Sequence, residues 1–287
     1  MQKGGKKRPL RKPQSQSRPG QESKMTPVPV ATTDRAGSGK LKDKIVFISG
    51  GDSGIGRAVA ILFAKEGAKL AISYLNEHKD AEETRRLIEE VEGECLLIPG
   101  DLSREINCVR AVNKTVKKYG AIDVLINNAA VHYEAKNPED ISSDQLVKTF
   151  ATNFFSYVWI TQAALPHIPE GGCIINTASV TAYRGSPSLI DYASTKGAIV
   201  SFTRSLSSNL IKRKIRVNGV APGPIWTPLI VSTFKPDKVA DFGSDVPMAR
   251  AGQPAEIAPS YLFLASDDAS YITGQFIHPN GGEIVNG

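Results

Sequence analysis

Four side chains of this sequence have the types and the order that proton transfer to a carbonyl oxygen requires. Tyr192 and Lys196 lie four residues apart in a predicted helix and share a face, and of the eight tyrosines only Tyr192 has a lysine at that spacing. A nearby ammonium favours the phenolate and is expected to lower the tyrosine pKa from about 10. Tyr192 would then act as general acid or base, Ser179 would hold the same oxygen, and Asn153 could anchor a water chain from Lys196. Taken singly, these residues would be a surface helix pair, a helix N-cap and a polar helix residue.

A glycine-rich turn follows the first apolar run and opens an apolar helix. Gly50, Gly54 and Gly56 have the spacing Gly-x₃-Gly-x-Gly, with Ser53 and Ile55 between them. Such a turn lets backbone N–H groups approach a pyrophosphate at a helix N-terminus. Strand-to-helix turns also use glycine for steric reasons alone, so it is the position after the first strand that favours phosphate binding. No Gly-Lys-Ser/Thr ending follows, which disfavours an ATP-binding P-loop.

Short apolar runs alternate with longer amphipathic stretches from residue 41 onward. The runs lack period-2 alternation, as expected for strands covered on both faces. Strict alternation of strand and helix predicts a parallel sheet with right-handed crossovers. We therefore expect one doubly wound α/β domain of Rossmann type over residues 41–287, with a seven-stranded parallel sheet and helices on both faces. The predicted strands are Ile45–Ser49, Leu70–Tyr74, Cys95–Ile98, Val124–Ile126, Cys173–Asn176, Val217–Ala221 and Gln275–His278, and the predicted helices are Ile55–Glu66, Ala81–Glu92, Arg104–Tyr119, Ser143–Leu165, Tyr192–Lys212 and Pro254–Ala265.

Two segments fall outside this alternation. Residues 1–40 carry a charge balance of +8, whereas the rest of the chain is at −2, although the whole chain is at +6. This basic extension is rich in Pro, Gly, Ser and Gln, so we expect it to be largely disordered, at least over residues 1–21, and dispensable for catalysis. Residues 224–250 are long and Pro-rich and follow the carboxyl end of a strand, where a substrate-covering lid would lie.

With these motifs in this order, the sequence resembles the short-chain dehydrogenase/reductase family from about Leu41 to Gly287. Asn127-Asn128-Ala129-Ala130 is similar to the family's Asn-Asn-Ala-Gly strand end and departs from it only at Ala130. The resemblance implies a catalytic tetrad of Asn153, Ser179, Tyr192 and Lys196. It also implies that the cofactor is bound by Gly50, Ser53, Gly54, Ile55, Gly56, Tyr74, Asp101, Leu102, Asn128, Ala129, Tyr192, Lys196, Pro222, Gly223, Ile225 and Thr227. The extension resembles that of a bacterial branch that includes general stress proteins, aldehyde reductases and glucose or ribitol dehydrogenase homologues, which implies a role in the stress response.

The expected activity is hydride transfer between NAD or NADP and a small carbonyl or alcohol substrate, with aldehyde reduction favoured over sugar or polyol oxidation. The second predicted strand ends in Tyr74-Leu75-Asn76-Glu77, which has neither the acid that binds the ribose of NAD nor an arginine for the phosphate of NADP. This slightly favours NAD, although Lys79 or Arg57 could approach a phosphate. A non-catalytic nicotinamide sensor would share the cofactor motifs, but it would need no Tyr-Lys pair. Sugar-nucleotide epimerases share that pair but need a larger carboxyl-terminal domain.

The remaining expectations concern compartment and partners. Three cysteines at unrelated spacings and four scattered histidines predict no disulfide framework and no metal site. The chain has neither a secretory signal nor an apolar stretch long enough for a membrane span, so we expect a cytoplasmic protein. The extension has no aromatic residue to stack on bases, which disfavours nucleic-acid binding. The family resemblance, with apolar Ala198, Ile199, Phe202 and Leu206 on one helix, predicts a homotetramer. His132, near the expected cleft, is interpreted as a solvated loop residue rather than one that shapes the substrate site.

Overall fold

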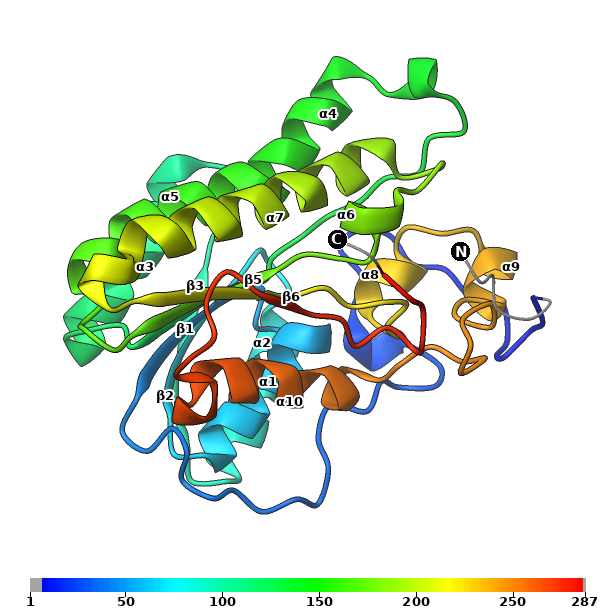
Figure 1. Cartoon of the computed structure of the whole chain (residues 1–287). Coiled ribbons are helices and arrows are strands. Elements are labelled where there is room, and N and C mark those ends of the chain that lie inside the picture. Colours follow the sequence, from blue (N-terminus) through cyan, green and yellow to red (C-terminus); the bar gives the residue numbers. More distant parts are fainter. Residues whose placement is uncertain (1–6, 286–287) are drawn as a thin grey trace.

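A parallel β-sheet forms the centre of the molecule, which is described here from a computed structural model covering residues 7–285. Within these residues the sheet has seven strands in the order β3-β2-β1-β4-β5-β6-β7, all parallel (Figure 1). The fold class predicted from the sequence is confirmed. The strands are β1 Ile45–Ser49, β2 Lys69–Tyr74, β3 Glu94–Pro99, β4 Val124–Asn127, β5 Cys173–Thr177, β6 Arg216–Val220 and β7 Phe276–Ile277.

Helices cover both faces of this sheet, with α1, α2 and α10 on one side and α3, α4, α5 and α7 on the other (Figure 1). Alternate residues of a strand therefore pack into different cores: Val46 and Ile48 face the first group of helices, and Phe47 faces the second. This explains why the strands are apolar at consecutive positions. The helices are α1 Gly54–Lys65, α2 His78–Glu89, α3 Glu105–Tyr119, α4 Ser143–Phe150, α5 Ser156–Ala164, α6 Thr181–Arg184, α7 Ile190–Leu210, α8 Pro228–Val231, α9 Pro236–Ala240 and α10 Pro254–Ala265.

The helix predicted over residues 143–165 has an irregular centre. Residues Ala151–Phe155 form a π-helical turn between α4 and α5, and Asn153 lies in it. A π-turn inserts one residue into the helical repeat and loosens the backbone hydrogen-bond ladder, and such turns are frequent at functional sites. The sequence pattern did not reveal it because the apolar periodicity continues on either side.

The N-terminal extension differs from the disorder expected for it. Residues 7–27 are mostly extended and pack against residues 224–250 (Figure 1). Residues 33–40 instead hydrogen-bond with Lys65 and Glu66 at the end of α1. The backbone N–H groups of Leu10 and Gln16 donate to the carbonyls of Ala240 and Val231, each at 2.8 Å. The guanidinium of Arg11 donates to the Val239 carbonyl at 2.9 Å. Composition predicted disorder because the segment cannot form a core of its own; contacts with a distant part of the chain order it instead. The first six residues lie outside the described range.

The same segment completes a small apolar cluster. Met25 is 2% exposed and packs with residues that precede, form and follow α8 and α9. The indole N–H of Trp226, a side chain with no exposed surface, donates to the carbonyl of Pro27 at 2.8 Å. The cluster comprises Met25, Leu189, Trp226, Ile230, Val231, Phe234, Val239 and Ala251. Residues 224–250 are therefore held between the extension and the main domain.

Candidate active site

The carboxyl ends of the central strands bring the predicted site residues to one edge of the sheet. β1 and β4 are neighbours although they are not consecutive, and in doubly wound sheets ligands bind beside the carboxyl ends at such a switch point. The glycine-rich turn follows β1, Asn128 and Ala129 follow β4, and Ser179 follows β5. Parts of the chain that are up to 130 residues apart are therefore adjacent.

The glycine-rich turn has a shape that only glycine permits at two positions. Gly50 has φ of +68°, and a Cβ there would lie 3.0 Å from the Cα of Ala129. A Cβ on Gly56 would lie 1.9 Å from the Gly50 carbonyl oxygen, so α1 packs directly on the turn. The Asn128 amide donates to the Gly50 carbonyl at 3.0 Å and fixes the turn to β4. This open, side-chain-free cradle at a helix N-terminus fits the pyrophosphate of a dinucleotide.

The start of α1 already attracts an anion from within the protein. The Gly54 N–H donates to a carboxylate oxygen of Glu22 at 2.6 Å. Ile55, the next residue, has an N–H that enters no hydrogen bond among residues 7–285. The helix start therefore keeps a donor for a second anionic group beside the one that Glu22 engages.

Residues 222–227 connect β6 to α8, and their last residue, Thr227, lies against this turn. A Cβ added at Gly54 would lie 3.1 Å from Thr227 Cγ2, and one at Gly223 would lie 2.7 Å from the Asn280 backbone. Ile225 forms an isolated parallel bridge with Gly252. Of the residues predicted here as cofactor contacts, Thr227 therefore packs against the glycine-rich turn. Gly223 and Ile225 pack against Asn280 and Gly252, and the Pro222 carbonyl accepts the Val180 N–H at 3.0 Å.

Tyr192 and Lys196 occupy consecutive turns of α7, as predicted. Lys196 is 1% exposed, its Nζ donates to the Thr177 carbonyl at 2.7 Å, and the same Nζ lies 5.4 Å from the Tyr192 ring centroid. Burial lowers the pKa of Lys196 to about 7. It also raises the pKa of Tyr192 to about 12, and the Ser179 hydroxyl opposes this.

The expected fall in the Tyr192 pKa is therefore wrong for the protein by itself. Desolvation of the phenol is the largest influence on its pKa, and it is the Ser179 hydroxyl, not the buried amine of Lys196, that opposes it. A spacing of four residues places the two groups together but does not report how much water surrounds them.

Ser179 and Asn153 take different positions relative to this pair. Ser179 is 8% exposed and its hydroxyl accepts the Thr181 N–H at 3.2 Å, which leaves its own proton free to donate. The Asn153 side chain is fully buried and pairs with both backbone groups of Val131, each at 2.8 Å. Asn153 therefore fixes the loop after β4 with its side chain, and the π-turn around it is what could supply backbone groups to a water chain.

The predicted cofactor contacts Tyr74, Asp101 and Leu102 lie at the ends of β2 and β3: Tyr74 is the last residue of β2, and the other two follow β3. Tyr74 is buried and its hydroxyl is 2.9 Å from Nδ1 of His78, while Leu102 is 6% exposed. Asp101 is exposed, and one of its carboxylate oxygens accepts the Ser103 N–H at 3.0 Å. The Asp101 carboxylate is therefore accessible to a ligand at the surface, whereas the Tyr74 side chain is packed inside the protein.

Buried acids lie close to this end of the site. Asp52, in the glycine-rich turn, is 8% exposed, and burial together with the charge of Glu77 raises the pKa of its carboxyl to about 7. Arg57, considered above as a phosphate ligand, is 5% exposed and donates to the carbonyls of Asp52 and Asp80 at 2.8 Å each. Arg57 is thus fully engaged inside the protein and cannot serve a phosphate.

His132 belongs to the site, and its interpretation as a solvated loop residue is wrong. Its ring is 4% exposed and lies 5.1 Å, edge-on, from that of Tyr192 and 5.3 Å from that of Phe234. Its Nδ1 has no hydrogen-bond partner among the described residues. Nothing in the local sequence distinguishes a buried histidine after β4 from a solvated one; only the packing of residues 224–250 buries it.

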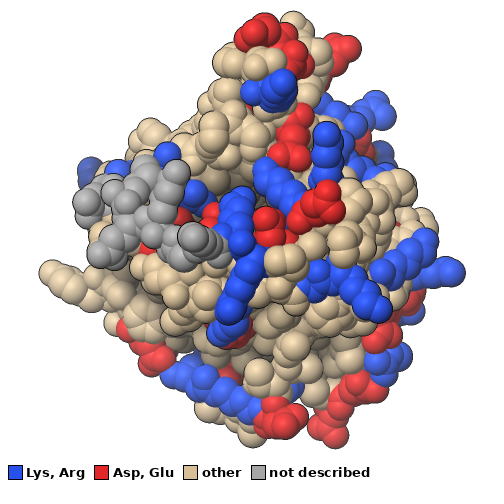
Figure 2. Space-filling view, turned by 90° about the vertical axis from the view of Figure 1, so that its right-hand side faces the viewer, with Lys and Arg blue, Asp and Glu red and all other residues tan. Residues whose placement is uncertain are grey.

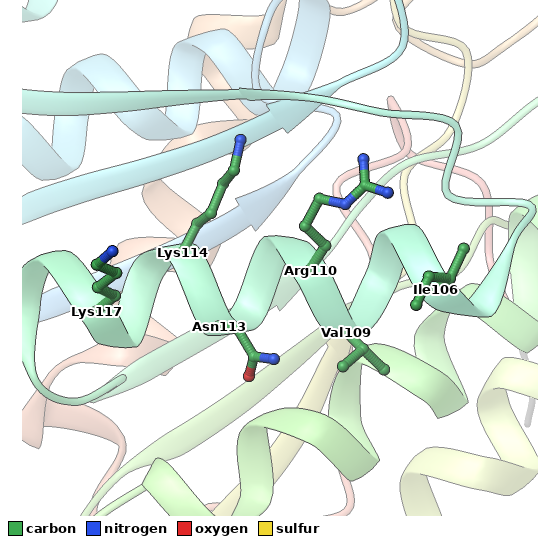
Figure 3. A pocket seen from close by; sticks show the side chains of 6 residues that line it. All are labelled: Ile106, Val109, Arg110, Asn113, Lys114 and Lys117. Carbon is green, nitrogen blue, oxygen red and sulfur yellow. The ribbon is translucent and has the colours of Figure 1, made fainter.

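Outside this edge, the described residues offer no comparable chemistry. A groove of about 310 Å³ runs along α3 and is lined by Ile106, Val109, Arg110, Asn113, Lys114 and Lys117, all from that one helix (Figure 3). No group of three or more His, Cys, Asp or Glu side chains within residues 7–285 could hold a metal ion. No helix in that range is long and apolar enough to cross a membrane.

The sequence of this chain matches a known protein family and several named relatives. The family model described as enoyl-(acyl carrier protein) reductase matches residues 50–283. General stress protein 39 of Bacillus subtilis is 53% identical over 95% of this chain and 96% of its own. NADPH-dependent aldehyde reductase 1 of Arabidopsis thaliana chloroplasts is 52% identical over 96% of this chain and 98% of its own.

Solved structures with a similar fold also belong to short-chain dehydrogenases. A short-chain dehydrogenase of Burkholderia cenocepacia in complex with NADP is similar with a TM-score of 0.80, at 27% identity, over 85% of this chain and 98% of that one. A glucose/ribitol dehydrogenase of Brucella melitensis is similar with a TM-score of 0.78, at 33% identity, over 85% of this chain and 97% of that one. The chain belongs to the short-chain dehydrogenase/reductase family and is an NAD(P)-dependent oxidoreductase.

Proposed function

We propose that this protein reduces aldehydes with a reduced nicotinamide cofactor, and that Asn153, Ser179, Tyr192 and Lys196 carry out the chemistry. The observation that carries the proposal is the position of Tyr192. Its side chain is partly exposed and lies beside the buried Lys196 and near Ser179, at the sheet edge that also holds the glycine-rich turn. The name of the Arabidopsis relative supports an aldehyde as substrate.

The residues divide the work according to their surroundings. Ser179 donates its free proton to the substrate oxygen and fixes its position. Tyr192 gives its proton to the same oxygen as negative charge develops there. Lys196 has a pKa of about 7, so it can return a proton toward Tyr192 at neutral pH. The bound nicotinamide supplies the hydride and, when oxidised, a positive charge that favours the tyrosinate.

Cofactor contacts are proposed for the residues around the glycine-rich turn, namely Gly50, Ser53, Gly54, Ile55, Gly56, Tyr74, Asp101, Leu102, Asn128, Ala129, Tyr192, Lys196, Pro222, Gly223, Ile225 and Thr227. For the choice of cofactor we propose a modest preference for NAD. Glu77, which follows β2, and Asp52, whose carboxyl has a pKa of about 7 and is partly charged at neutral pH, disfavour the additional phosphate of NADP, and Arg57 is engaged elsewhere. The Arabidopsis relative is named for NADPH, so kcat/KM should be compared directly with both cofactors.

Oxidation of a sugar or polyol is the second candidate. Relatives from carrot and rice, each 50% identical, are named glucose and ribitol dehydrogenase or its homolog. The same residues would act in reverse, with Tyr192 accepting a proton from the alcohol.

The decisive experiment is turnover of a panel of aldehydes, ketones, sugars and polyols with NADH, NADPH, NAD and NADP. Tyr192→Phe keeps the ring and removes only the proton, so kcat should fall by about 10²–10⁴-fold or more while cofactor affinity measured by fluorescence persists. If Tyr192→Phe retained more than a tenth of wild-type kcat, the proton would come from another group. Cofactor binding without turnover of any compound would favour the nicotinamide-sensing alternative.

We also propose a homotetramer. An apolar surface along the π-turn, α5 and α7 supports it. Phe155 is 40% exposed, and its ring is tilted against that of Trp159 with the centroids 5.8 Å apart; the centroids of Phe154 and Phe202 are 5.9 Å apart. Of the α7 positions predicted for an interface, Ile199 faces the core, whereas Ala198, Phe202 and Leu206 are partly exposed. Light scattering at micromolar protein should give four times the monomer mass.

The cytoplasm is the compartment we propose, with a role in the stress response. All three cysteines are free, and burial raises the pKa of each thiol, so they are poor nucleophiles suited to a reducing environment. The name of general stress protein 39 supports the physiological role. Cell fractionation and transcript levels after osmotic or oxidative challenge would test both.

A further inference from the structure

Three separate parts of the chain meet at Tyr133, the neighbour of His132, whose ring packs against Tyr192. They are the loop after β4, the N-terminal segment and α4. The guanidinium of Arg18 lies 4.3 Å from the ring centroid of Tyr133, and Nζ of Lys148 lies 6.0 Å from the same centroid. Tyr133 is thus a platform that holds two cations from segments 130 residues apart in the sequence.

This platform is directly connected to the catalytic tyrosine. Tyr133 follows His132, whose ring packs edge-on against Tyr192 at 5.1 Å. On the other side of His132 lies Phe234, and Nζ of Lys238 is 4.3 Å from its ring centroid. The pKa of His132 is lowered to about 3, first by burial and then by the positive charges of Arg18, Lys196 and Lys238. These cations are therefore close enough to influence the ring beside Tyr192.

The positive charges around Tyr133 and Phe234 are only partly balanced by carboxylates. Lys238 pairs with Glu134 at 2.6 Å. Arg18 and Lys148 form no ion pair with any carboxylate among residues 7–285. Both side chains are exposed, and stacking on a ring leaves the N–H edges of a guanidinium free to donate. Figure 2 views the molecule from the side on which α8 and α9 lie in Figure 1. Lys and Arg side chains gather near the centre of that face, with a few acids between them.

We propose that the carbonyl substrate carries an anionic group, a carboxylate or a phosphate, which binds to Arg18 and Lys148 at Tyr133 while the carbonyl oxygen meets Tyr192. An arginine fork matches both oxyanions with two parallel hydrogen bonds. Lysine adds a second charge without fixed geometry. This inference rests on the proposed function and narrows its substrate class. It makes the N-terminal segment a wall of the active site.

The test compares aldehydes of the same carbon number that do or do not carry an anionic group. Butanal is paired with succinic semialdehyde for the carboxylate, and glyceraldehyde with its 3-phosphate for the phosphate. The variants are Arg18→Gln and Lys148→Gln. Lys12→Gln is the matched control, since Lys12 is an exposed cation of the same segment with no ion pair or side-chain hydrogen bond among the described residues.

The wild type should prefer the anionic member of at least one pair, and that pair identifies the oxyanion. Arg18→Gln should lower kcat/KM for it by tenfold or more, chiefly through KM, and change the neutral member by less than twofold. Lys148→Gln should do the same more weakly, and Lys12→Gln should do neither. Equal losses on both members, or no loss on either, would overturn the inference while leaving aldehyde reduction intact.

A binding measurement tests the anion site independently of the proposed aldehyde reduction. Succinate and inorganic phosphate are titrated by calorimetry into the wild type and Arg18→Gln, each saturated with cofactor. Weaker binding of one anion to the variant supports the anion site even if every aldehyde tested is a poor substrate. Equal binding, or none to either protein, overturns it. Failure of every carbonyl compound to turn over would instead count against the proposed function.

Discussion

Glu22 and Arg57 form a buried ion pair between the N-terminal segment and the helix that follows the glycine-rich turn. Oε1 of Glu22 lies 2.6 Å from Nη1 of Arg57, and their side chains are 1% and 6% exposed. The second Glu22 oxygen accepts the Gly54 N–H at 2.6 Å. A residue from the extension thus helps to fix the start of α1, where we propose that the cofactor binds.

Loss of one partner of this pair should destabilise the protein strongly. Glu22→Gln removes the nearer of the two carboxylates that neutralise the buried Arg57 charge and leaves only Asp80, 3.8 Å away. Loss of one partner from a buried ion pair typically costs about 3–5 kcal/mol. Urea unfolding should report this loss. In a cycle with Arg57→Met, the double variant should lose less than the sum of the single variants. Lys214→Gln, which breaks an exposed pair with Glu170, should change stability little. Strict additivity of the two buried changes would show that the pair is not coupled.

Removal of residues 1–21 should weaken substrate binding, in contrast to the dispensability expected from the sequence. The deletion removes the hydrogen bonds from Leu10 and Gln16 to Ala240 and Val231 but keeps Glu22 and Met25. Residues 224–250 should then exchange amide hydrogens faster, and KM for the best aldehyde should rise several-fold. Deletion of residues 1–6 is the control and should alter neither. Unchanged exchange in the longer deletion would mean that the segment does not restrain residues 224–250.

A methyl group at Gly56 should abolish cofactor binding. In Gly56→Ala the new Cβ would lie 1.9 Å from the Gly50 carbonyl oxygen, so α1 and the turn must separate. Affinity for NADH and NADPH, measured by fluorescence, should fall by at least tenfold. Gly197→Ala is the matched control, because a Cβ there has no atom within 4 Å and alanine is the better helix former. Equal cofactor affinity in the two variants would argue against the assigned turn.

Asp52 should make stability depend on pH in the acidic range. Burial and the charge of Glu77 raise its pKa from 3.8 to about 7, so between these values the folded state holds a proton that the unfolded state releases. The contribution of protonated Asp52 to the free energy of unfolding is therefore complete below pH 3.8 and is lost as the pH rises through 7. Between these values the free energy of unfolding falls by up to about 1.4 kcal/mol per pH unit. Urea unfolding of the wild type and Asp52→Asn at several pH values should show this slope in the difference between their free energies of unfolding, because the other titrating groups, such as His132, are common to both proteins.

Ser179→Ala should shift the pH dependence of alcohol oxidation upward. The Ser179 hydroxyl opposes the burial that raises the Tyr192 pKa, so its removal makes the phenolate harder to form. The acid limb of kcat/KM should move to higher pH, and the loss at neutral pH should be smaller than in Tyr192→Phe. Ser194→Ala, an exposed serine of α7 whose hydroxyl donates to the Ile190 carbonyl, should leave the profile unchanged.

The sequence by itself determined the sheet, the order of its elements and the residues gathered at its carboxyl edge. Each of these depends on local pattern: apolar runs predict buried strands, glycine spacing predicts the turn before α1, and a four-residue spacing puts Tyr192 and Lys196 on one helix face. Only the tertiary structure decided the surroundings of those residues. The π-turn at Asn153, the burial of His132 and the high pKa of Tyr192 follow from packing between distant segments. The same is true of the N-terminal segment, whose composition predicted disorder because it contains too little apolar surface to fold alone. Its partners lie more than 200 residues away at Val231 and Ala240, and no local pattern records contacts at that separation.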